Sequence, residues 1–382
     1  MSIRVVVVDD SVVIRRLVVQ ALESDSGIEV IATAANGKLG LAKIEQLKPD
    51  AITMDIEMPE MNGVEAVRAL RKKGIQTPII MFSTLTERGA TATLDALTAG
   101  ASDYVTKPSN VGSINESLRV VAGELIPKIK ALVPHKATSR GGAPGRPGAP
   151  GAGGPASTAT AHAMFRQSSV NTRTDERQHA IRAVVLGSST GGPEALSKVI
   201  ASLNQPLPVP MIVTQHMPPV FTKQLAARLD RLGPNRVHEA HNRQLLQPAN
   251  IYLAPGDYHL ELAYRDNGVY TTLTQGPPVN FCRPSVDVMF ASAQKIFGPE
   301  LLSVILTGMG SDGKNGAGHI AEAGGTVIVQ DQGTSVVWGM PGATATAGYA
   351  HRILPINEIG PTVQAILART KAVQPLNRGG AS

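Results

Sequence analysis

The sequence predicts an α/β protein with two doubly wound domains in one chain. Its 382 residues suit two domains, and hydrophobic residues make up 42% of them, enough for two cores. Short apolar runs alternate with amphipathic stretches on both sides of a central segment rich in Gly, Ala and Pro. Alternating strands and helices predict parallel sheets covered on both faces, and right-handed crossovers restrict the topology to doubly wound sheets.

The first domain is predicted to span residues 1–134 as five strand–helix units, a (βα)5 arrangement. Apolar runs indicate strands at 4–8, 29–33, 51–54, 78–82 and 103–105. Amphipathic periodicity indicates helices at 12–24, 37–47, 63–73, 88–98 and 113–132.

Residues 135–180 are predicted to form a flexible linker. From Gly141 to Pro155 every residue is Gly, Ala or Pro except Arg146. Such a segment buries too little apolar surface to offset the entropy lost on ordering it. The linker separates the first domain from a second one predicted at 181–382.

The second domain is predicted to be mostly parallel with one antiparallel hairpin. Strands are indicated at 183–187, 210–215, 250–254, 259–263, 269–274, 302–307 and 326–330. Helices are indicated at 193–203, 219–231, 286–297 and 313–323. Asp266-Asn267-Gly268 between the fourth and fifth of these strands is a hairpin signal.

The net charge of +6 is distributed in a way that argues against nucleic-acid binding. Residues 1–134 carry 15 basic and 16 acidic side chains, residues 135–180 carry 6 and 2, and residues 181–382 carry 15 and 12. Neither domain therefore has the dense basic face that phosphate binding needs. No signal peptide or apolar run of 18 residues is present, so we expect a cytoplasmic protein without membrane insertion.

The only cysteine, Cys282, excludes an internal disulfide and suits a reducing compartment. It lies in Asn280-Phe281-Cys282-Arg283-Pro284, where no glycine turn or strand end presents it. The sequence therefore disfavours Cys282 as a catalytic nucleophile.

Acidic residues follow the predicted strand ends of the first domain. Asp9 and Asp10 follow the first strand, and Asp55 follows the third. Doubly wound sheets bind ligands at this edge, and three carboxylates there need a cation such as Mg²⁺. Ser83 and Lys107, at the ends of the fourth and fifth strands, could bind a transferred phosphoryl group. Taken singly, Asp9-Asp10 could cap a helix and Lys107-Pro108 could form a turn.

Because of these residues together, the segment from residue 1 to about residue 125 resembles a response-regulator receiver domain. The matching segments are Val-Val-Val-Asp9-Asp10, Met-Asp55-Ile-Glu-Met-Pro-Glu-Met-Asn-Gly63 and Lys107-Pro108. The resemblance implies phosphorylation of Asp55 by a histidine kinase, with Mg²⁺ bound by Asp10, Asp55 and the backbone carbonyl of Glu57. It also implies that Asp9 completes the acidic pocket, that Ser83 turns toward the phosphate and that Lys107 is its charge partner.

In the second domain, Gly187-Ser188-Ser189-Thr190-Gly191 fits the G-x-S-x-G pattern of a nucleophile elbow between a strand and a helix. Its glycines allow a sharp bend that would lift Ser189 to the rim of the sheet, although a glycine-rich turn without chemistry is the alternative. His216 and Asp312 each follow another predicted strand. A serine, a histidine and an aspartate at one sheet edge can form a catalytic triad in any chain order.

Two points stay open from spacing alone. His238, His241, His259 and His319 compete with His216 as the base, with His259 the strongest rival because it lies at a strand start. Asp312 could instead cap the helix predicted at 313–323.

Residues from about 181 to 370 resemble the catalytic domain of chemotaxis protein-glutamate methylesterases. The matching segments are Leu-Gly-Ser-Ser189-Thr-Gly-Gly, Gln-His216-Met-Pro-Pro, Ile-Tyr-Leu-Ala-Pro255-Gly-Asp257, Arg283-Pro-Ser-Val-Asp287 and Leu-Thr-Gly-Met309-Gly-Ser-Asp312-Gly. The family's triad falls on Ser189, His216 and Asp312. Ser188 stands where alanine is usual and Ser311 where asparagine is frequent, and the linker is longer than in short-linker members.

This resemblance implies hydrolysis of glutamate methyl esters and deamidation of glutamines on chemoreceptors, through an acyl-enzyme and without a cofactor for the esterase reaction. We expect the backbone N–H groups of Thr190 and Met309 to form an oxyanion hole, because both lie on turns at the same rim. We also expect the unphosphorylated receiver to dock over Ser189, and phosphorylation of Asp55 to release it.

Three other functions fit less well. A phosphorylation-gated interaction module with an inactive hydrolase fold would not need Ser189, His216 and Asp312 intact. A nucleotide site at Gly187–Gly192 would need Gly-x-Gly-x-x-Gly or a following Lys-Ser/Thr, which the segment lacks. A transcription factor would need a helix-turn-helix with a basic recognition helix after the linker, and none is seen.

Overall fold

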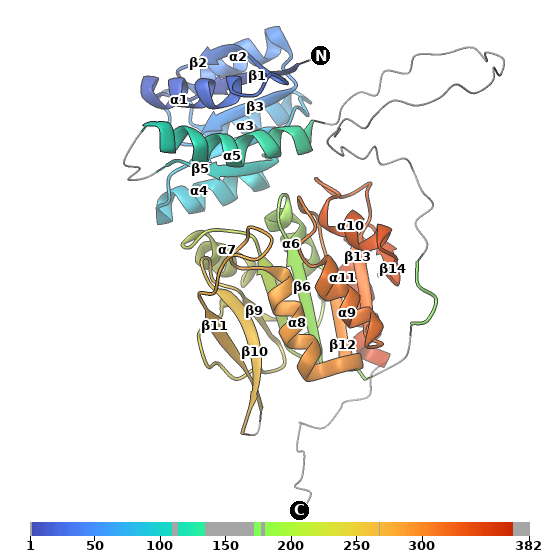
Figure 1. The fold of residues 1–382 in the computed structure, drawn as a ribbon. Helices are drawn as coiled ribbons and strands as arrows, with labels where there is room; N and C mark the ends of the chain where they lie inside the picture. The colour runs from blue at the N-terminus through green and yellow to red at the C-terminus, as the bar shows by residue number, and fades with distance from the viewer. Residues whose placement is uncertain (1, 109–113, 134–171, 177–179, 267, 370–382) are drawn as a thin grey trace, which may run out of the picture.

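The computed structural model describes residues 2–108, 114–133, 172–176, 180–266 and 268–369. These residues form two α/β bodies, each with its own parallel sheet, so the predicted fold class is confirmed (Figure 1). The hairpin residue Asn267 and most of the linker predicted at 135–180 lie outside the described residues. The described stretch 172–176 attaches to the second domain, because Arg352 pairs with Glu176 at 2.9 Å.

The first domain has the strand order β2-β1-β3-β4-β5, and every pair is parallel. Its strands are β1 Ile3–Val8, β2 Ile28–Ala34, β3 Ala51–Asp55, β4 Ile79–Ser83 and β5 Asp103–Thr106. Its helices are α1 Val12–Glu23, α2 Gly37–Leu47, α3 Gly63–Lys72, α4 Glu87–Thr98 and α5 Ile114–Leu132. Alternate side chains of β1 enter two different cores. Val5 and Val7 pack with α1 and α5, whereas Val6 and Val8 pack with α2, α3 and α4.

The second domain has a seven-stranded sheet in the order β14-β13-β12-β6-β7-β9-β8, and its pairs are all parallel. The strands are β6 Ala183–Ser188, β7 Met211–Gln215, β8 Arg236–Glu239, β9 Asn250–Leu253, β12 Leu301–Ile305, β13 Thr326–Gln330 and β14 Arg352–Leu354. The strands β10 His259–Arg265 and β11 Gly268–Thr274 form the predicted antiparallel hairpin as a separate sheet.

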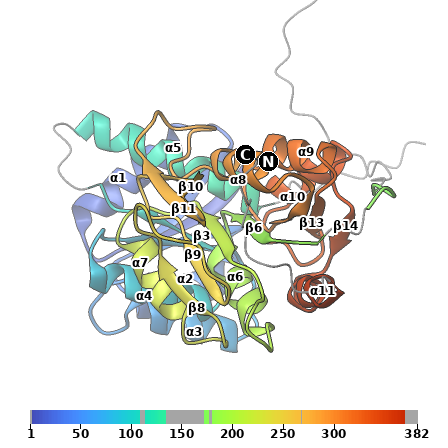
Figure 2. The same ribbon diagram turned by 90° about the horizontal axis from the view of Figure 1, so that it is seen from below.

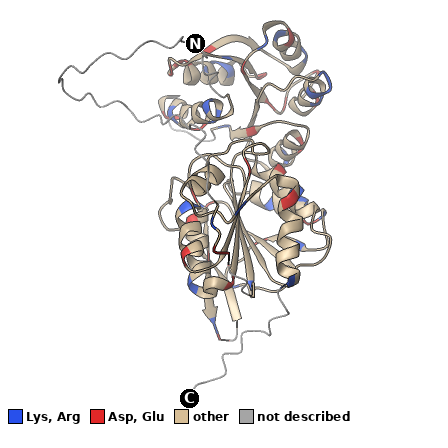
Figure 3. Cartoon of the chain, turned by 90° about the vertical axis from the view of Figure 1, so that its right-hand side faces the viewer, with Lys and Arg blue, Asp and Glu red and all other residues tan. Residues whose placement is uncertain are grey.

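Helices cover both faces of this sheet. They are α6 Gly192–Ala201, α7 Phe221–Leu229, α8 Val286–Phe297, α9 Lys314–Glu322, α10 Met340–Thr346 and α11 Ile356–Arg369, with a 3-10 turn at Gly298–Glu300. Figure 2 shows α11 on the opposite side of β13 and β14 from α9 and α10. In Figure 3 the charged residues lie mainly on the helices, and the strands between them are largely uncharged.

Sequence patterns missed β8, β14, α10 and α11. The two strands are sheet edges of four and three residues, too short for an alternating pattern to emerge. The helix α10 is only seven residues long, and α11 contains Pro361, which the helix pattern disfavours. None of the described helices is long and apolar enough to cross a membrane.

In both sheets the chain reverses its direction of winding beside a central strand. This point lies between β1 and β3 in the first domain and between β6 and β12 in the second. Ligands of doubly wound sheets bind at the carboxyl ends of strands at such points. The predicted functional residues of each domain lie there.

Candidate active site and receiver pocket

Ser189 follows β6 directly and begins the turn into α6. Ser189 itself is outside the left-handed region, and Gly191, with φ +75°, makes the bend. At Gly192 an added Cβ would lie 1.9 Å from Gln215 Oε1, so only glycine allows this approach. The glycines therefore act as predicted: Gly191 takes the positive φ of the bend, and Gly192 leaves room for Gln215.

Gln215, the last residue of β7, fixes the carbonyls beside the two predicted catalytic residues. Its Nε2 donates to the backbone oxygens of Ser189 and His216, both at 3.0 Å. Its Oε1 accepts from Ser188 Oγ at 2.7 Å. Ser188, which stands where alanine is usual, thus links β6 to β7 by a hydrogen bond. The sequence did not predict this role.

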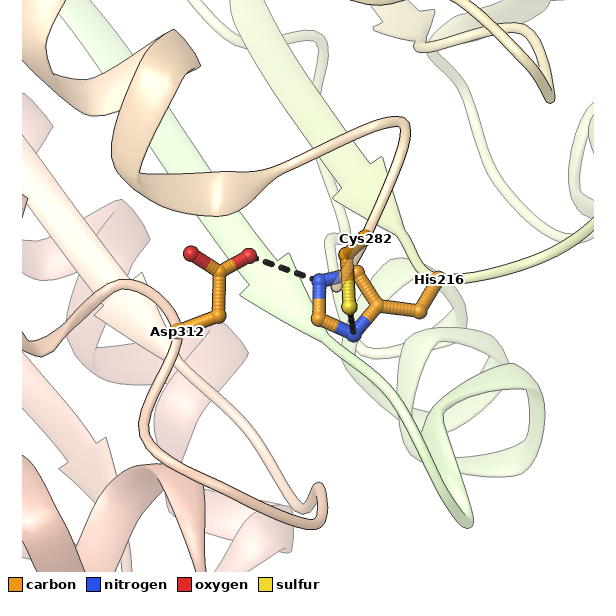
Figure 4. A group of neighbouring side chains, drawn as sticks. All are labelled: His216, Cys282 and Asp312. Atoms are coloured by element: carbon orange, nitrogen blue, oxygen red, sulfur yellow. Dashed lines mark hydrogen bonds and ion pairs between the residues drawn. The ribbon is translucent and has the colours of Figure 1, made fainter. Parts of the chain in front are cut away.

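His216 lies between Asp312 and Cys282 (Figure 4). Its Nε2 is 2.8 Å from Asp312 Oδ2, and its Nδ1 is 3.4 Å from Cys282 Sγ. Because the Asp312 carboxylate accepts a hydrogen bond from Nε2–H, Nδ1 is the nitrogen with the free lone pair in neutral His216. Nδ1 is therefore the atom that can act as a base.

Asp312 is buried, and its carboxylate is saturated with donors. Besides His216 these are Ser285 Oγ at 2.9 Å, Asn280 Nδ2 at 2.8 Å and the backbone N–H groups of Val286 at 2.6 Å and Asp287 at 3.1 Å. The carboxylate thus sits at the N-terminus of α8. The alternative that Asp312 caps the helix that follows it is wrong, since α9 begins after Gly313 and has no side-chain cap.

These contacts shift both pKa values. Burial alone would raise the pKa of Asp312, but hydrogen bonds from His216, Asn280 and Val286 outweigh it and lower the pKa to about 2. Burial likewise would lower the pKa of His216, but the bond to Asp312 and the contact with Cys282 raise it to about 9. The pair therefore favours the imidazolium that a general base forms when it takes a proton.

Ser189 and His216 line one cavity of about 470 Å³, together with Cys282. Among the described residues, the Ser189 hydroxyl has no hydrogen-bond partner. The atom that contacts His216 Nδ1 is Cys282 Sγ. Sequence reasoning missed this placement of Cys282, although the matched segment that starts at Arg283 adjoins it. Nitrogen, sulfur and oxygen atoms of His216, Cys282 and Asp312 lie within 4.8 Å and suit zinc, but the oxygens of Asp312 are already engaged.

The rival histidines are not at this cavity. Both ring nitrogens of buried His259 are used, Nε2 with the Pro277 carbonyl at 3.0 Å and Nδ1 with the Ser285 N–H at 3.2 Å. His238 is paired with Gln244 and packs edge-on against Tyr252. Within the described chain, His216 is the histidine that the structure brings to Ser189.

Thr190 and Met309 follow β6 and β12 at the same edge of the sheet. In the described residues, neither backbone N–H donates a hydrogen bond, so both amides are available to an oxyanion. The side chain of Thr190 is engaged differently, because its Oγ1 donates to Asp103 Oδ2 of the first domain at 2.9 Å.

The first domain forms a wall of the Ser189 cavity. Its lining residues there are Tyr104, Val105, Thr106, Glu124 and Lys128. The interface continues beyond the cavity, where Tyr104 stacks on Phe221 with ring centroids 4.9 Å apart and Arg228 pairs with Asp95 at 2.8 Å. Figure 1 shows α4 of the first domain facing α7 of the second.

The acidic pocket of the first domain lies at the predicted strand ends. Lys107 Nζ is 2.8 Å from Asp55 and 3.1 Å from Asp9. Burial and the nearby Asp9 raise the pKa of Asp55 to about 6, although Lys107 opposes the shift. One lysine thus leaves the buried carboxylates under-neutralised.

Carboxylate oxygens of Asp9, Asp10 and Asp55 lie within 4.8 Å of one another, a hard donor set that fits Mg²⁺. Glu57 and Ser83 line the same 180 Å³ cavity. The Ser83 hydroxyl does not turn toward Asp55 here. It donates to the carbonyl of Gly89 at 3.2 Å and accepts from Thr93 at 2.8 Å, both on α4.

Comparisons with known proteins agree with this two-part layout. Residues 5–119 match the family model of the response regulator receiver domain, and residues 184–363 match that of CheB methylesterase. The chain is 56% identical over 370 residues to a protein-glutamate methylesterase/protein-glutamine glutaminase of Nocardioides, covering 97% of each chain. It is 42% identical to the protein of that name in Trichodesmium erythraeum, over 94% of this chain and 97% of that one.

Among solved structures, the CheB methylesterase catalytic domain of Thermotoga maritima is 41% identical and is covered completely by half of this chain, with a TM-score of 0.48. The family assignment rests on the two relatives named above, because they align with this chain across both domains. The chain therefore belongs to the protein-glutamate methylesterase/protein-glutamine glutaminase family of ester hydrolases, with a response-regulator receiver domain ahead of its CheB methylesterase domain.

Proposed function

We propose that this enzyme is a phosphorylation-activated esterase that removes methyl groups from glutamate esters of chemoreceptors, and that it also deamidates receptor glutamines. One observation carries the proposal. The cavity that holds Ser189 and His216 is closed on one side by residues of the receiver domain. A substrate helix cannot occupy the space that the docked receiver fills, so the two domains must separate or slide before a receptor is modified.

In the proposed reaction, Ser189 Oγ attacks the ester carbonyl while His216 Nδ1 takes its proton. The imidazolium then protonates the leaving methoxide, and methanol departs from an acyl-enzyme. Water attacks the acyl-enzyme by the same proton route and regenerates Ser189 and glutamate. With glutamine as substrate, ammonia leaves in place of methanol.

Asp312 holds His216 in the tautomer with Nδ1 free and stabilises its cation. This is the reverse of the usual triad, in which Nε2 is the base. In the docked state Cys282 Sγ contacts His216 Nδ1. The Ser189 hydroxyl therefore has to take the place of the thiol at Nδ1 before the reaction begins. The N–H groups of Thr190 and Met309 are the proposed donors to the tetrahedral oxyanion.

Phosphorylation of Asp55 is proposed to act through Ser83 and α4. A phosphoryl group on Asp55 offers acceptors that compete for the Ser83 hydroxyl, which now bonds Gly89 of α4. The same helix carries Asp95, the partner of Arg228 on α7. Movement of Ser83 thus has a direct route to the docking interface.

The partners follow from this scheme. A chemotaxis histidine kinase supplies the phosphoryl group, and cytoplasmic helices of chemoreceptors supply the ester. Mg²⁺, when bound by Asp10, Asp55 and the Glu57 carbonyl, would neutralise charge on the incoming phosphoryl group. Lys107 remains the charge partner of Asp55, which it already contacts at 2.8 Å.

The test is mass spectrometry of methylated receptor helices incubated with the full chain, with and without a small-molecule phosphodonor. We expect loss of methyl groups with the enzyme, and faster loss with the phosphodonor. The Asp55→Asn chain should keep the slow rate and lose the acceleration. Equal rates with and without phosphodonor in the wild-type chain would contradict activation by phosphorylation.

A further inference from the structure

The segment 279–282 beside the active site forms a two-residue turn. Val279 and Cys282 pair as a β-bridge, each N–H donating to the other carbonyl at 3.0 and 2.9 Å. Asn280 and Phe281 between them have φ of +52° and +64°. Two successive positive φ values are what a type I′ turn requires, and its preferred residues are Asn followed by Gly. Asn280 suits its position, whereas Phe281 stands where glycine is favoured.

Nothing within the described structure compensates this conformation at Phe281. A bulky residue with positive φ is strained, and packing of its ring could offset the strain. Phe281 is instead fully exposed, with a relative accessibility of 103%, the highest of the large apolar residues in the described chain. Uncompensated strain beside an active site points to a function that the free protein does not display.

The turn is held in a fixed place relative to the catalytic groups. Asn280 Nδ2 donates to Asp312 Oδ1 at 2.8 Å and to Asp287 Oδ2 at 2.9 Å. The next residue but one, Cys282, contacts His216. Phe281 lines the same cavity as Ser189. A fully exposed side chain that also lines a cavity stands at its open edge, so the ring is presented where a substrate would arrive.

We propose that Phe281 determines substrate specificity by packing on an apolar side chain of the substrate helix, three or four residues from the modified glutamate. This inference rests on the proposed function. Residues at that spacing are neighbours on a helix, with Cβ atoms about 5–6 Å apart. The ester would enter the cavity toward Ser189 while the apolar neighbour covers the Phe281 ring. A free small ester lacks that neighbour and gains nothing from the ring.

The test uses the full chain with a phosphodonor and compares wild type with Phe281→Gly. Glycine suits the turn better, so the variant should unfold at the same or a higher temperature. With methylated receptor as substrate, we expect kcat/KM to fall on the order of tenfold, mostly through KM, because the buried ring area is lost. Hydrolysis of a small ester such as p-nitrophenyl acetate should change less than about twofold.

Phe281→Leu should recover part of the receptor activity, since leucine keeps an apolar contact. Leu39→Ala is the matched control, because Leu39 is 51% exposed on α2, which Figure 1 places away from the second domain. It should leave both substrates unaffected. Unchanged receptor kinetics in Phe281→Gly, or equal losses on receptor and small ester, would overturn the inference. If wild type hydrolyses the small ester but never demethylates the receptor, the proposed function fails instead and this inference fails with it.

Discussion

The receiver pocket and the esterase pocket both lie at the carboxyl ends of parallel strands, yet the pKa values of their carboxylates are shifted in opposite directions. In the receiver, Asp55 is buried beside Asp9 with one lysine between them, and its pKa is raised to about 6. In the esterase, Asp312 accepts five hydrogen bonds, and its pKa is lowered to about 2. The first carboxylate still needs a cation, and the second needs nothing more.

In the proposed function, this difference separates a switch in the receiver from a catalytic site in the esterase domain. An under-neutralised carboxylate gains most when a cation and a phosphoryl group arrive, so the receiver pocket is suited to change state. A saturated carboxylate keeps His216 in one orientation throughout a reaction cycle. The esterase site lacks only a contact between Ser189 and His216, because Cys282 Sγ contacts His216 Nδ1 instead.

The largest expected effect separates Ser189 from Cys282. Ser189→Ala should lower kcat for a small ester by about 10⁴-fold or more, as loss of a serine nucleophile does elsewhere. Cys282→Ala should stay within about tenfold of wild type, because the thiol only competes for His216 in the docked state. The measurement is steady-state hydrolysis by the full chain with a phosphodonor. The reverse ranking would make Cys282 the nucleophile and contradict the proposed mechanism.

A second prediction concerns pH. As the proposed base, His216 can act only when neutral, and its pKa is raised from 6.5 to about 9, so kcat/KM should still be rising with pH between 7 and 9. Cys282→Ala removes one cause of that shift and should move the rise to lower pH. The shift also affects stability: protonated His216 favours the folded chain, fully below pH 6.5 and no longer above about 9. A profile that is flat above pH 7 would contradict the ion pair with Asp312.

The smallest expected effect concerns the docking interface between the two pockets. Arg228 and Asp95 pair at 2.8 Å and are both partly exposed, so the pair is worth at most about 1 kcal/mol. Arg228→Glu should raise the esterase rate of the unphosphorylated full chain about two- to fivefold. The double variant with Asp95→Arg should return to the low rate. If the double variant stays as active as the single one, this pair does not hold the domains together.

Sequence patterns located the described strands other than the edge strands β8 and β14, together with the residues directly after them, because buried parallel strands are uninterrupted apolar runs. Asp9, Asp55 and Lys107 lie at the carboxyl ends of β1, β3 and β5, which are parallel strands of one sheet, so their meeting at one edge follows from topology. The same logic brought Ser189 and His216 to one cavity. Resemblance, rather than periodicity, favoured Asp312 over its role as a helix cap.

Contacts from irregular segments could not be predicted in this way. The turn that carries Cys282 depends on a short bridge and on bonds from Asn280, neither of which leaves a periodic pattern. Docking of the receiver near Ser189 was expected, but the residues of the interface were not predicted, because Tyr104 and Phe221 have the sequence pattern of ordinary core residues although they stack across the two domains. Packing between domains is set by surface shape, and a single sequence does not display it.

The claim that the receiver restrains the esterase is tested most directly by comparing residues 181–382 alone with the unphosphorylated full chain. The measurement is the initial rate of receptor demethylation at equal enzyme concentration, with folding of the fragment checked by circular dichroism. We expect the fragment to be faster, and a phosphodonor to accelerate the full chain but not the fragment. A fragment no faster than the unphosphorylated full chain would contradict occlusion of Ser189 by the receiver.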